Sequence, residues 1–389
     1  MMLTEDGCRQ RRTNFWRCVP ENIDWVLIAD ARHVQYFCGF RIHPLSFSAD
    51  QRALLLLKRD GRATLICDNF VRRTASCPFY VDEEVTVSWY THRKSVINRD
   101  DALHQALQDC RSQWSTSLGA IEPEAVPEVI AAAVSEYSDW QFQHAITGKP
   151  TTAGHIIREL RRQKLPDEVE LLKACMAAGE AGHAAAFDAV RSGATELDVY
   201  LAIQQAAIRQ AGQACVVYGD FRANSAAQPK AGGLPTCHSL QHGELFIADF
   251  SVILHGYRSD FTNTIAVGTP SDAQVAMFEA CRDALLAAEA ELKAGQSARR
   301  IYEAASTVFT DRNYPPLSHH CGHGLGMEHP EPPILVPEST DTLLVGDVVT
   351  IEPGLYVEGT GGMRFEHNYL VTNTGCERLS NHRIALIAD

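Results

Sequence analysis

The sequence predicts an α+β protein of two domains, an α/β N-terminal domain and a larger C-terminal domain of long helices and hairpins. A chain of 389 residues is too long for one ordinary hydrophobic core. After Pro150 its short apolar runs give way to long helices rich in small residues. Two hairpins further along each carry a mirrored pair of carboxylates. We therefore expect domains at residues 1–150 and 151–389.

Composition excludes several classes of protein. Hydrophobic residues make up 45% of the chain and charged residues 21%, which is ordinary for a globular protein. The formal charge of −13 argues against a nucleic-acid partner, which needs clustered Lys and Arg. The N-terminus lacks the apolar core of a signal peptide, and no run of about 18 apolar residues offers a membrane span. The twelve cysteines form no Cys-x-x-Cys pair. These features favour a cytoplasmic protein with reduced cysteines and no membrane partner.

In the N-terminal domain we expect strands between residues 24 and 68. Residues 25–30 form a short apolar run, and residues 52–67 read as a hairpin that turns at Asp60-Gly61. Helices are predicted over residues 101–108 and 124–137.

Three long helices are predicted in the C-terminal domain. The first begins at Pro166 and stops near Gly193, because proline suits a first helical turn and glycine a C-terminal stop. Thr195 and Asp198 resemble a capping box that opens a second helix ending at Gly212. A third helix spans residues 272–294. Residues 244–268 and 343–372 are predicted to be strands joined by glycine turns.

The first of these strand regions places two aspartates in symmetry. Asp249 and Asp260 lie at equal distances from a midpoint at Leu254/His255, and His255-Gly256 has turn character. A hairpin folded about that midpoint would set the two carboxylates directly opposite each other, with Cβ atoms about 4.5–5.5 Å apart. Because two such charges repel, a cation is expected between them.

The second strand region repeats this arrangement. Glu352 and Glu366 are symmetric about Gly359, and both follow or precede apolar residues. Four buried carboxylates would be untenable without positive charge, and two divalent cations supply a matching charge. An imidazole is a common further ligand, and His323 lies between Gly322 and Gly324, where the backbone could pass close to a crowded metal site. The residues therefore predict a dinuclear metal centre.

At these residues the sequence resembles the pita-bread (M24-type) metallopeptidase family, in its aminopeptidase P and Xaa-Pro dipeptidase (prolidase) branch. The resemblance covers most of the chain and implies that five residues bind metal. In chain order they are Asp249, Asp260, His323 in a Gly-His-Gly loop, Glu352 in TIEPGLY and Glu366 in GGMRFE. The helical segment from Ile157 also looks like the one that opens the catalytic domain of this branch.

The resemblance implies a fold of two α-β halves with curved sheets and an α/β N-terminal domain. It implies that a hydroxide bridging two metal ions attacks the bond next to proline in short peptides. Glu352 would orient or deprotonate that water, and Arg364 would brace the second carboxylate pair. The ions could be Mn, Fe, Co or Zn, because oxygen-rich ligation with one imidazole suits each of them. A homodimer is expected from the resemblance alone.

On the substrate side the sequence departs from the family pattern. The usual second histidine stands seven positions after the metal histidine, whereas His329 stands six after His323. His329 is the expected catalytic or substrate-binding residue, with Glu328 as an alternative acid or base. The usual upstream Pro-His has no clear equivalent, although His238 and His242 are nearby, and Asn263 replaces a usual arginine.

Two alternative functions remain open at this point. Dimethylsulfoniopropionate lyases of the same fold have an acidic residue six positions after the metal histidine, so a lyase-like enzyme acting on a small molecule is the runner-up. A non-enzymatic binding protein on the same fold is disfavoured, because such a protein would be expected to have lost metal-ligand residues. The His319-His320 pair is expected to pack or face solvent, and Cys321 lacks a positioned base.

Overall fold

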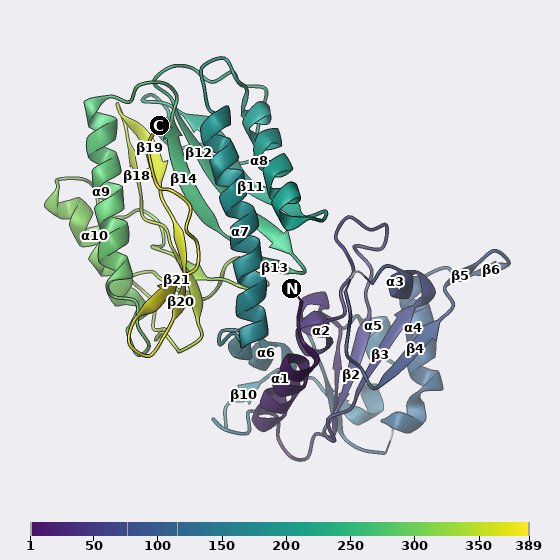
Figure 1. Ribbon diagram of the computed structural model, residues 1–389. Helices are drawn as coiled ribbons and strands as arrows, with labels where there is room; N and C mark the ends of the chain where they lie inside the picture. The colour runs from purple at the N-terminus through teal and green to yellow at the C-terminus, as the bar shows by residue number, and fades with distance from the viewer. Residues whose placement is uncertain (1, 76, 115, 388–389) are drawn as a thin grey trace. The chain divides into compact units, whose positions relative to one another are not determined.

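The computed structural model describes residues 2–75, 77–114 and 116–387. The chain forms two compact units, Met1–Arg161 and Arg162–Asp389, which run from purple to blue and from teal to yellow in Figure 1.

The first unit is built on a mixed sheet with strand order β4-β3-β2-β1-β7-β8. Its strands are β1 (Trp25–Ile28), β2 (Leu54–Lys58), β3 (Ala63–Asp68), β4 (Glu83–Val87), β7 (Gly119–Ile121) and β8 (Ser138–Asp139). Two small ribbons accompany it, β5 (Tyr90–Thr91) with β6 (Lys94–Ser95) and β9 (Phe142–Gln143) with β10 (Pro150–Thr151). The predicted hairpin at Asp60-Gly61 is confirmed, because β2 pairs antiparallel with β3 and Gly61 has a φ of 93°.

The helices of this unit agree less well with the sequence expectations. They are α1 (Glu5–Cys18), α2 (Ala31–Cys38), α3 (Asn69–Arg73), α4 (Arg99–Asp109), α5 (Glu128–Ala131) and α6 (Ala153–Leu160). Helix α4 was expected, whereas α2 lies in a region predicted as strands. The helix predicted over residues 124–137 is wrong in extent: only α5 and a 3-10 turn at Ser135–Tyr137 form there. Pro127 precedes α5, and a helix cannot extend upstream through a residue without an N–H.

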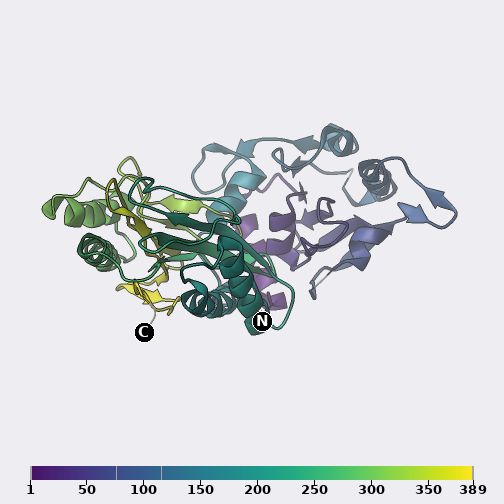
Figure 2. The ribbon, with the colours of Figure 1, turned by 90° about the horizontal axis from the view of Figure 1, so that it is seen from above.

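The second unit has two α-β halves. One half has β11 (Val216–Asn224), β12 (Leu245–Leu254), β13 (Tyr257–Arg258) and β14 (Phe261–Ala266), with α7 (Pro166–Ala189) and α8 (Glu196–Ala211). The other has β15 (His323–Gly324), β16 (Glu331–Ile334), β17 (Val348–Ile351), β18 (Gly354–Val357), β19 (Gly361–Arg364), β20 (His367–Val371) and β21 (Cys376–Arg378), with α9 (Asp272–Glu289) and α10 (Ala298–Asp311). Figure 1 shows the strands between the α7/α8 and α9/α10 pairs, and Figure 2 shows the same halves from above.

Local sequence signals explain where these helices begin and end. Pro166 occupies the first turn of α7, and Thr195 with Asp198 forms the predicted capping box of α8. Helix α8 ends at Gly212, whose left-handed conformation (φ 66°) suits glycine. Helices α7 and α9 both end before the expected glycines, and α10 was not predicted.

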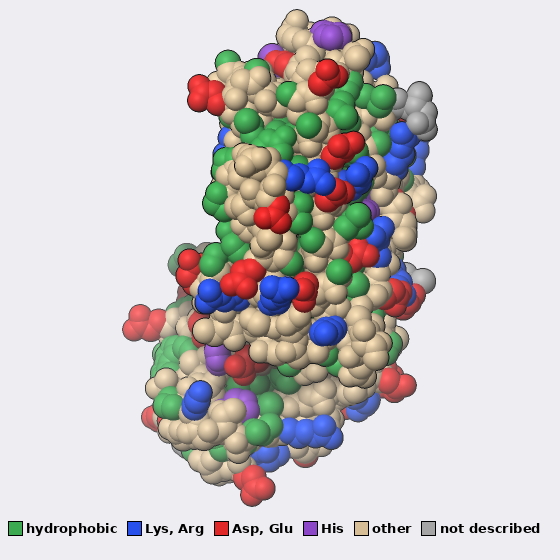
Figure 3. Space-filling view, turned by 90° about the vertical axis from the view of Figure 1, so that its left-hand side faces the viewer, with side chains coloured by type: hydrophobic (Ala, Val, Ile, Leu, Met, Phe, Trp, Pro, Cys, Tyr) green, Lys and Arg blue, Asp and Glu red, His purple; other side chains and the backbone are tan. Residues whose placement is uncertain are grey.

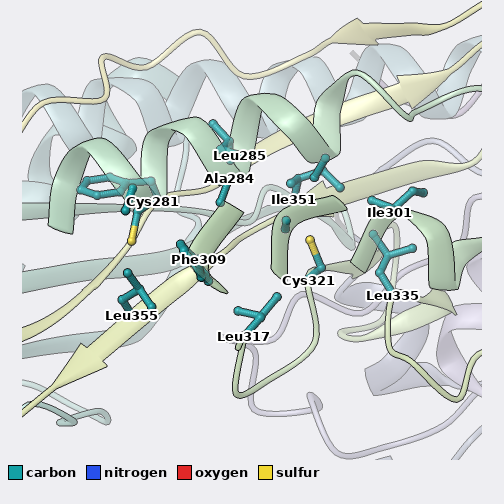
Figure 4. Close-up of a cluster of buried hydrophobic side chains, with 14 of the residues drawn as sticks. Cys281, Ala284, Leu285, Ile301, Phe309, Leu317, Cys321, Leu335, Ile351 and Leu355 are labelled. Carbon is teal, nitrogen blue, oxygen red and sulfur yellow. The ribbon is translucent and has the colours of Figure 1, made fainter. Parts of the chain in front are cut away.

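The α9/α10 pair buries its apolar faces against the strands. Figure 4 shows Cys281 and Leu285 of α9 with Phe309 of α10, facing Ile351 and Leu355 of the strand region. These side chains are at most 3% exposed. The resulting core fixes the backbone on both sides of Glu352.

Charged side chains of both signs lie on the surface of the protein. On the face in Figure 3, acidic and basic side chains are interspersed with apolar ones. Within the described part of the chain, no helix is long and apolar enough to cross a membrane.

Candidate metal centre

Three groups of potential metal ligands occur among the described residues. Within each group, one ligand atom of every member lies within 4.8 Å of the others. The groups are Asp249, Asp260 and Glu366; Asp260, His323 and His329; and His319, His320 and Glu352. Asp260 is common to the first two groups, and Glu352 Oε1 of the third lies 3.4 Å from His323 Nε2. The structure therefore brings all five predicted ligands to one place, from both halves of the second unit.

The relation between Asp249 and Asp260 differs from the expectation. Strands β12 and β14 pair Asp249 with Thr262, so the two aspartates are not directly opposite. The turn centre lies at His255-Gly256, where both residues have positive φ (46° and 82°), rather than at Leu254/His255. Asp260 lies two positions before Thr262, the residue opposite Asp249, and therefore on the same face of the sheet as Thr262. A diagonal pair still brings two carboxylates together.

The register of the second hairpin agrees with the expected symmetry. Ile351 pairs with His367 and Gly354 with Arg364, which sets Glu352 opposite Glu366. Gly359 at the centre has a φ of 84°. Glu366 accepts a hydrogen bond of 2.7 Å from Thr262 of β14, so the two halves meet at this carboxylate.

His323 is held so that one ring nitrogen faces the carboxylates. Its Nδ1 donates to the carbonyl of Gly324 at 2.9 Å, which leaves Nε2 3.6 Å from Asp260 Oδ2 and 3.4 Å from Glu352 Oε1. A backbone acceptor on the far nitrogen is typical of metal-binding histidines.

The glycines on either side of His323 have a different role from the expected one. A Cβ on Gly322 would lie 2.0 Å from the carbonyl oxygen of Thr350, and a Cβ on Gly324 would lie 2.1 Å from that of Pro332. These glycines are therefore required by neighbouring backbone rather than by space for a metal.

His329 reaches the same carboxylates despite its shifted position in the sequence. Its Nε2 lies 2.8 Å from Asp260 Oδ2, and its ring stands edge-on to that of His323 at 4.6 Å. Its side chain is 41% exposed, so one side remains accessible to a substrate. Glu328 is half-buried and belongs to none of the three groups.

A buried ion pair that the sequence analysis missed supports the His329 loop. Glu331 Oε1 accepts from the backbone N–H groups of Met327 and Glu328 at 3.0 and 2.9 Å. Lys164 Nζ lies 3.2 Å from Glu331 Oε2, and both side chains are at most 3% exposed. No local sequence pattern pairs these residues, which are far apart in the chain.

Arg364 contacts the first carboxylate pair more closely than the second. It hydrogen-bonds Asp249 and donates to the hydroxyl of Tyr356 at 2.8 Å, whereas its Nε lies 4.0 Å from Glu352 Oε2. Its hydrogen bond fixes Asp249, which the sequence analysis did not expect, while its role in bracing Glu352 and Glu366 stays a prediction. Asp220, 3.7 Å from the Arg364 guanidinium, was also missed by the sequence analysis.

The electrostatics of the cluster call for positive charge. Burial, followed by the neighbouring charges of Glu352 and Asp260, raises the pKa of Glu366 well above its ordinary value. Glu366 Oε1 has no hydrogen-bond partner among the described residues. Burial alone would also raise the pKa of Asp260, but the hydrogen bond from His329 and nearby His323 hold that pKa below the ordinary value. The residues present therefore fit divalent cations, which would neutralise Glu366 and use its free oxygen.

A cavity of about 320 Å³ opens on this cluster, and its lining includes Tyr218, Asp220, Asp249, Asp260 and His329. That volume lies at the small end of ligand pockets. Other residues weighed from the sequence lie outside it. His238 pairs with Glu244, Asn263 donates to the carbonyl of Ala385, and His242 belongs to none of the ligand groups.

Cys321 faces the apolar core. Figure 4 shows it among Leu317, Leu335 and Ile351, and its side chain is fully buried. Burial raises the pKa of its thiol. A nucleophilic role for Cys321 is therefore disfavoured, as expected.

Together, the two α-β halves and this cluster define a class of protein that gathers carboxylates and imidazoles into a candidate metal centre beneath a small pocket. Comparison with known proteins gives the family. Residues 170–373 match metallopeptidase family M24, and residues 17–163 match the creatinase/prolidase N-terminal domain. The chain belongs to metallopeptidase family M24, and it is a metallopeptidase.

Individual relatives extend over almost the whole chain. An Xaa-Pro dipeptidase of Lactobacillus helveticus is 28% identical over 362 residues, covering 91% of this chain and 92% of the relative. An Xaa-Pro dipeptidase structure from Bacillus anthracis superposes with a TM-score of 0.75 at 23% identity, covering 98% and 99% of the two chains. An X-Pro aminopeptidase structure from Thermotoga maritima gives a TM-score of 0.73 at 20% identity, covering 94% and 96%. The predicted α+β pita-bread fold with an N-terminal α/β domain is confirmed.

Proposed function

We propose that the protein is an Xaa-Pro peptidase that hydrolyses the bond before proline in short peptides, using two divalent cations. One observation carries the proposal: Asp249, Asp260 and Glu366 converge with an oxygen of each within 4.8 Å of the others. Such a buried set of carboxylates needs cations. The names of the relatives support the Xaa-Pro specificity and favour neither the lyase-like nor the non-enzymatic alternative.

In this proposal Asp249, Asp260, His323, Glu352 and Glu366 hold the ions. Bound ions would lower the pKa of a water molecule and polarise the scissile carbonyl. Mn, Fe, Co and Zn all remain candidates.

Three side chains of the protein do the remaining work. His320 Nδ1 and His323 Nε2 lie 3.3 and 3.4 Å from Glu352 Oε1. Against the effect of burial, these two imidazoles lower the pKa of Glu352, which favours the carboxylate form that can accept a proton. The hydrogen bond to Asp260 raises the pKa of His329, which can therefore carry a proton at Nε2 on the exposed side of the site. Arg364 fixes the orientation of Asp249.

The test is reconstitution of metal-free protein with each of the four metals, followed by incubation with Xaa-Pro dipeptides and Xaa-Pro-Yaa tripeptides. Matched Xaa-Ala peptides serve as controls, and mass spectrometry identifies the products. Cleavage restricted to the Xaa-Pro bond supports the proposal, and the preferred peptide length separates dipeptidase from aminopeptidase activity. A folded protein that holds two ions and cleaves none of these peptides contradicts it.

We also propose a cytoplasmic homodimer. The cytoplasm is supported by the sequence, whose twelve cysteines form no Cys-x-x-Cys pair. The dimer is inferred from the family resemblance alone, and light scattering of the purified protein tests it.

A further inference from the structure

The tandem histidines before the His323 loop form a group that the proposed mechanism does not use as metal ligands. One nitrogen from each of His319 and His320 and one oxygen of Glu352 lie within 4.8 Å of one another. Two imidazoles and one carboxylate are a common ligand set for a transition-metal ion. The group shares no residue with the two that contain Asp260, although Glu352 Oε1 also lies 3.4 Å from His323 Nε2.

His319 is already oriented as a ligand. Its Nδ1 donates to the carbonyl of His320 at 2.8 Å, so the lone pair of the neutral ring lies on Nε2. That Nε2 is buried and has no hydrogen-bond partner among the described residues. A backbone acceptor on one nitrogen and an unused lone pair on the other is the arrangement seen around metal-bound histidines.

His320 supplies the second imidazole at the solvent side. Its Nδ1 lies 3.3 Å from Glu352 Oε1, yet within the described residues it makes no hydrogen bond of good geometry. The His320 side chain is 38% exposed, whereas that of Glu352 is 8% exposed. An ion from solution could therefore reach the group past His320.

We propose that His319, His320 and Glu352 bind an additional, inhibitory Zn²⁺ ion beside the two-ion centre. This inference rests on the proposed metal centre, because Glu352 is common to both. Zn²⁺ suits two imidazoles, whereas Mn²⁺ prefers oxygen ligands. An ion bound here coordinates the Glu352 carboxylate, which can then no longer accept a proton, and hydrolysis slows.

The additional ion binds more weakly than the other two. Arg364 Nε lies 4.0 Å from Glu352 Oε2. Lys230 Nζ lies 5.3 Å from the centre of the Tyr356 ring, which is itself 5.8 Å from the His319 ring. These positive groups and the two neighbouring ions repel a further cation, so it binds only when zinc is in excess.

Counting ions by equilibrium dialysis and elemental analysis tests the inference. Wild type and His320→Asn are each dialysed against Mn²⁺ alone and against Zn²⁺ alone. We expect two Mn²⁺ per chain in both proteins, but three Zn²⁺ in wild type and two in His320→Asn. His155→Asn is the matched control, because His155 is an exposed histidine beside a carboxylate (Nε2 to Glu159 Oε1, 3.2 Å) and should leave the count of three unchanged.

Activity gives the second measurement. Excess zinc should inhibit wild type. In His320→Asn, the zinc concentration that halves the rate measured without excess zinc should be at least ~10-fold higher than in wild type. Two Zn²⁺ in wild type, or three in His320→Asn, overturns the additional site and leaves the proposed centre intact. Fewer than two Mn²⁺ in wild type overturns the proposed centre itself.

Discussion

His329 Nε2 lies 2.8 Å from Asp260 Oδ2, although His329 stands one position earlier in the sequence than the family pattern requires. The contact joins a half-exposed imidazole to a carboxylate that is almost fully buried. The shorter spacing therefore still places a histidine against the carboxylate cluster.

The first prediction concerns this histidine. His329→Ala should lower kcat on an Xaa-Pro substrate by about 100-fold, the lower range for loss of a proton-transfer group, while both ions remain bound. Steady-state kinetics with metal analysis on the same sample measures both effects. Glu328→Gln is the control, and it should leave kcat near the wild-type value. If Glu328→Gln loses activity and His329→Ala does not, the roles are reversed.

The second prediction separates ligands from other carboxylates. Asp260→Asn keeps the shape of the side chain but removes its charge, and it should lower metal affinity more than ~10-fold and abolish hydrolysis together. Metal titration followed by calorimetry measures the affinity. Asp188→Asn, at an exposed position on α7, should change neither quantity. Retention of both ions by Asp260→Asn at wild-type affinity would remove Asp260 from the ligand set.

The third prediction tests how Arg364 acts. Arg364→Lys keeps the charge but cannot hold Asp249 and Tyr356 together, so metal affinity should fall about 10–100-fold. Tyr356→Phe removes only one of these contacts and should have a smaller effect in the same titration. Equal metal affinities for wild type and Arg364→Lys would show that a positive charge at this position, without the two hydrogen bonds, is enough to maintain metal binding.

The parts of the site that could be predicted from sequence depend on local geometry. The symmetry of Glu352 and Glu366 about Gly359 is a property of one hairpin, and the structure has that register. The same reasoning misplaced the turn centre between Asp249 and Asp260 by one residue, because it set the midpoint at Leu254/His255 although it gave His255-Gly256 turn character. A one-residue shift of a turn centre moves the cross-strand partner by two positions, which keeps the side chains on one face.

The parts that could not be predicted depend on contacts between distant segments. Lys164 and Glu331 meet across 167 positions, and Arg364 finds Asp249 across 115. Neither pair is marked in the sequence by a periodic pattern or by a characteristic spacing. Helix α10 was missed, and the helix around α5 was predicted too long, for a related reason, because tertiary packing decides such elements as much as intrinsic propensity does.

The fourth prediction concerns acid stability. Burial lowers the pKa of His183 to about 4, and its ring is stacked between Phe250 and Phe261 at 4.5 and 5.0 Å. The unfolded chain binds a proton at this residue near pH 6.5, whereas the folded chain does not until about pH 4. The contribution of His183 to the unfolding free energy is therefore fully present above pH 6.5 and decreases as the pH falls toward 4. At pH 5 this residue alone lowers the unfolding free energy by roughly 2 kcal/mol relative to pH 7.5.

Urea unfolding at pH 7.5, 6 and 5 measures this effect, and a chelator keeps the protein metal-free at each pH so that metal release does not contribute. His183→Gln should reduce the dependence of the unfolding free energy on pH. His155→Gln, at an exposed position, should leave it unchanged. An unchanged pH dependence in His183→Gln would mean that other groups dominate acid unfolding.

The last prediction concerns the buried pair beneath the His329 loop. Lys164→Met leaves the Glu331 carboxylate buried without its cation, which should cost about 3–5 kcal/mol of unfolding free energy. The double variant Lys164→Met/Glu331→Gln removes the orphaned charge and should recover much of that loss. Because Glu331 holds the backbone of Met327 and Glu328, the single variant should also lower kcat through displacement of His329. Urea unfolding and kinetics on wild type, Lys164→Met, Glu331→Gln and the double variant form a complete cycle. If Lys164→Met loses less than about 1 kcal/mol, the pair does not stabilise the loop, and its place beneath His329 has no bearing on catalysis.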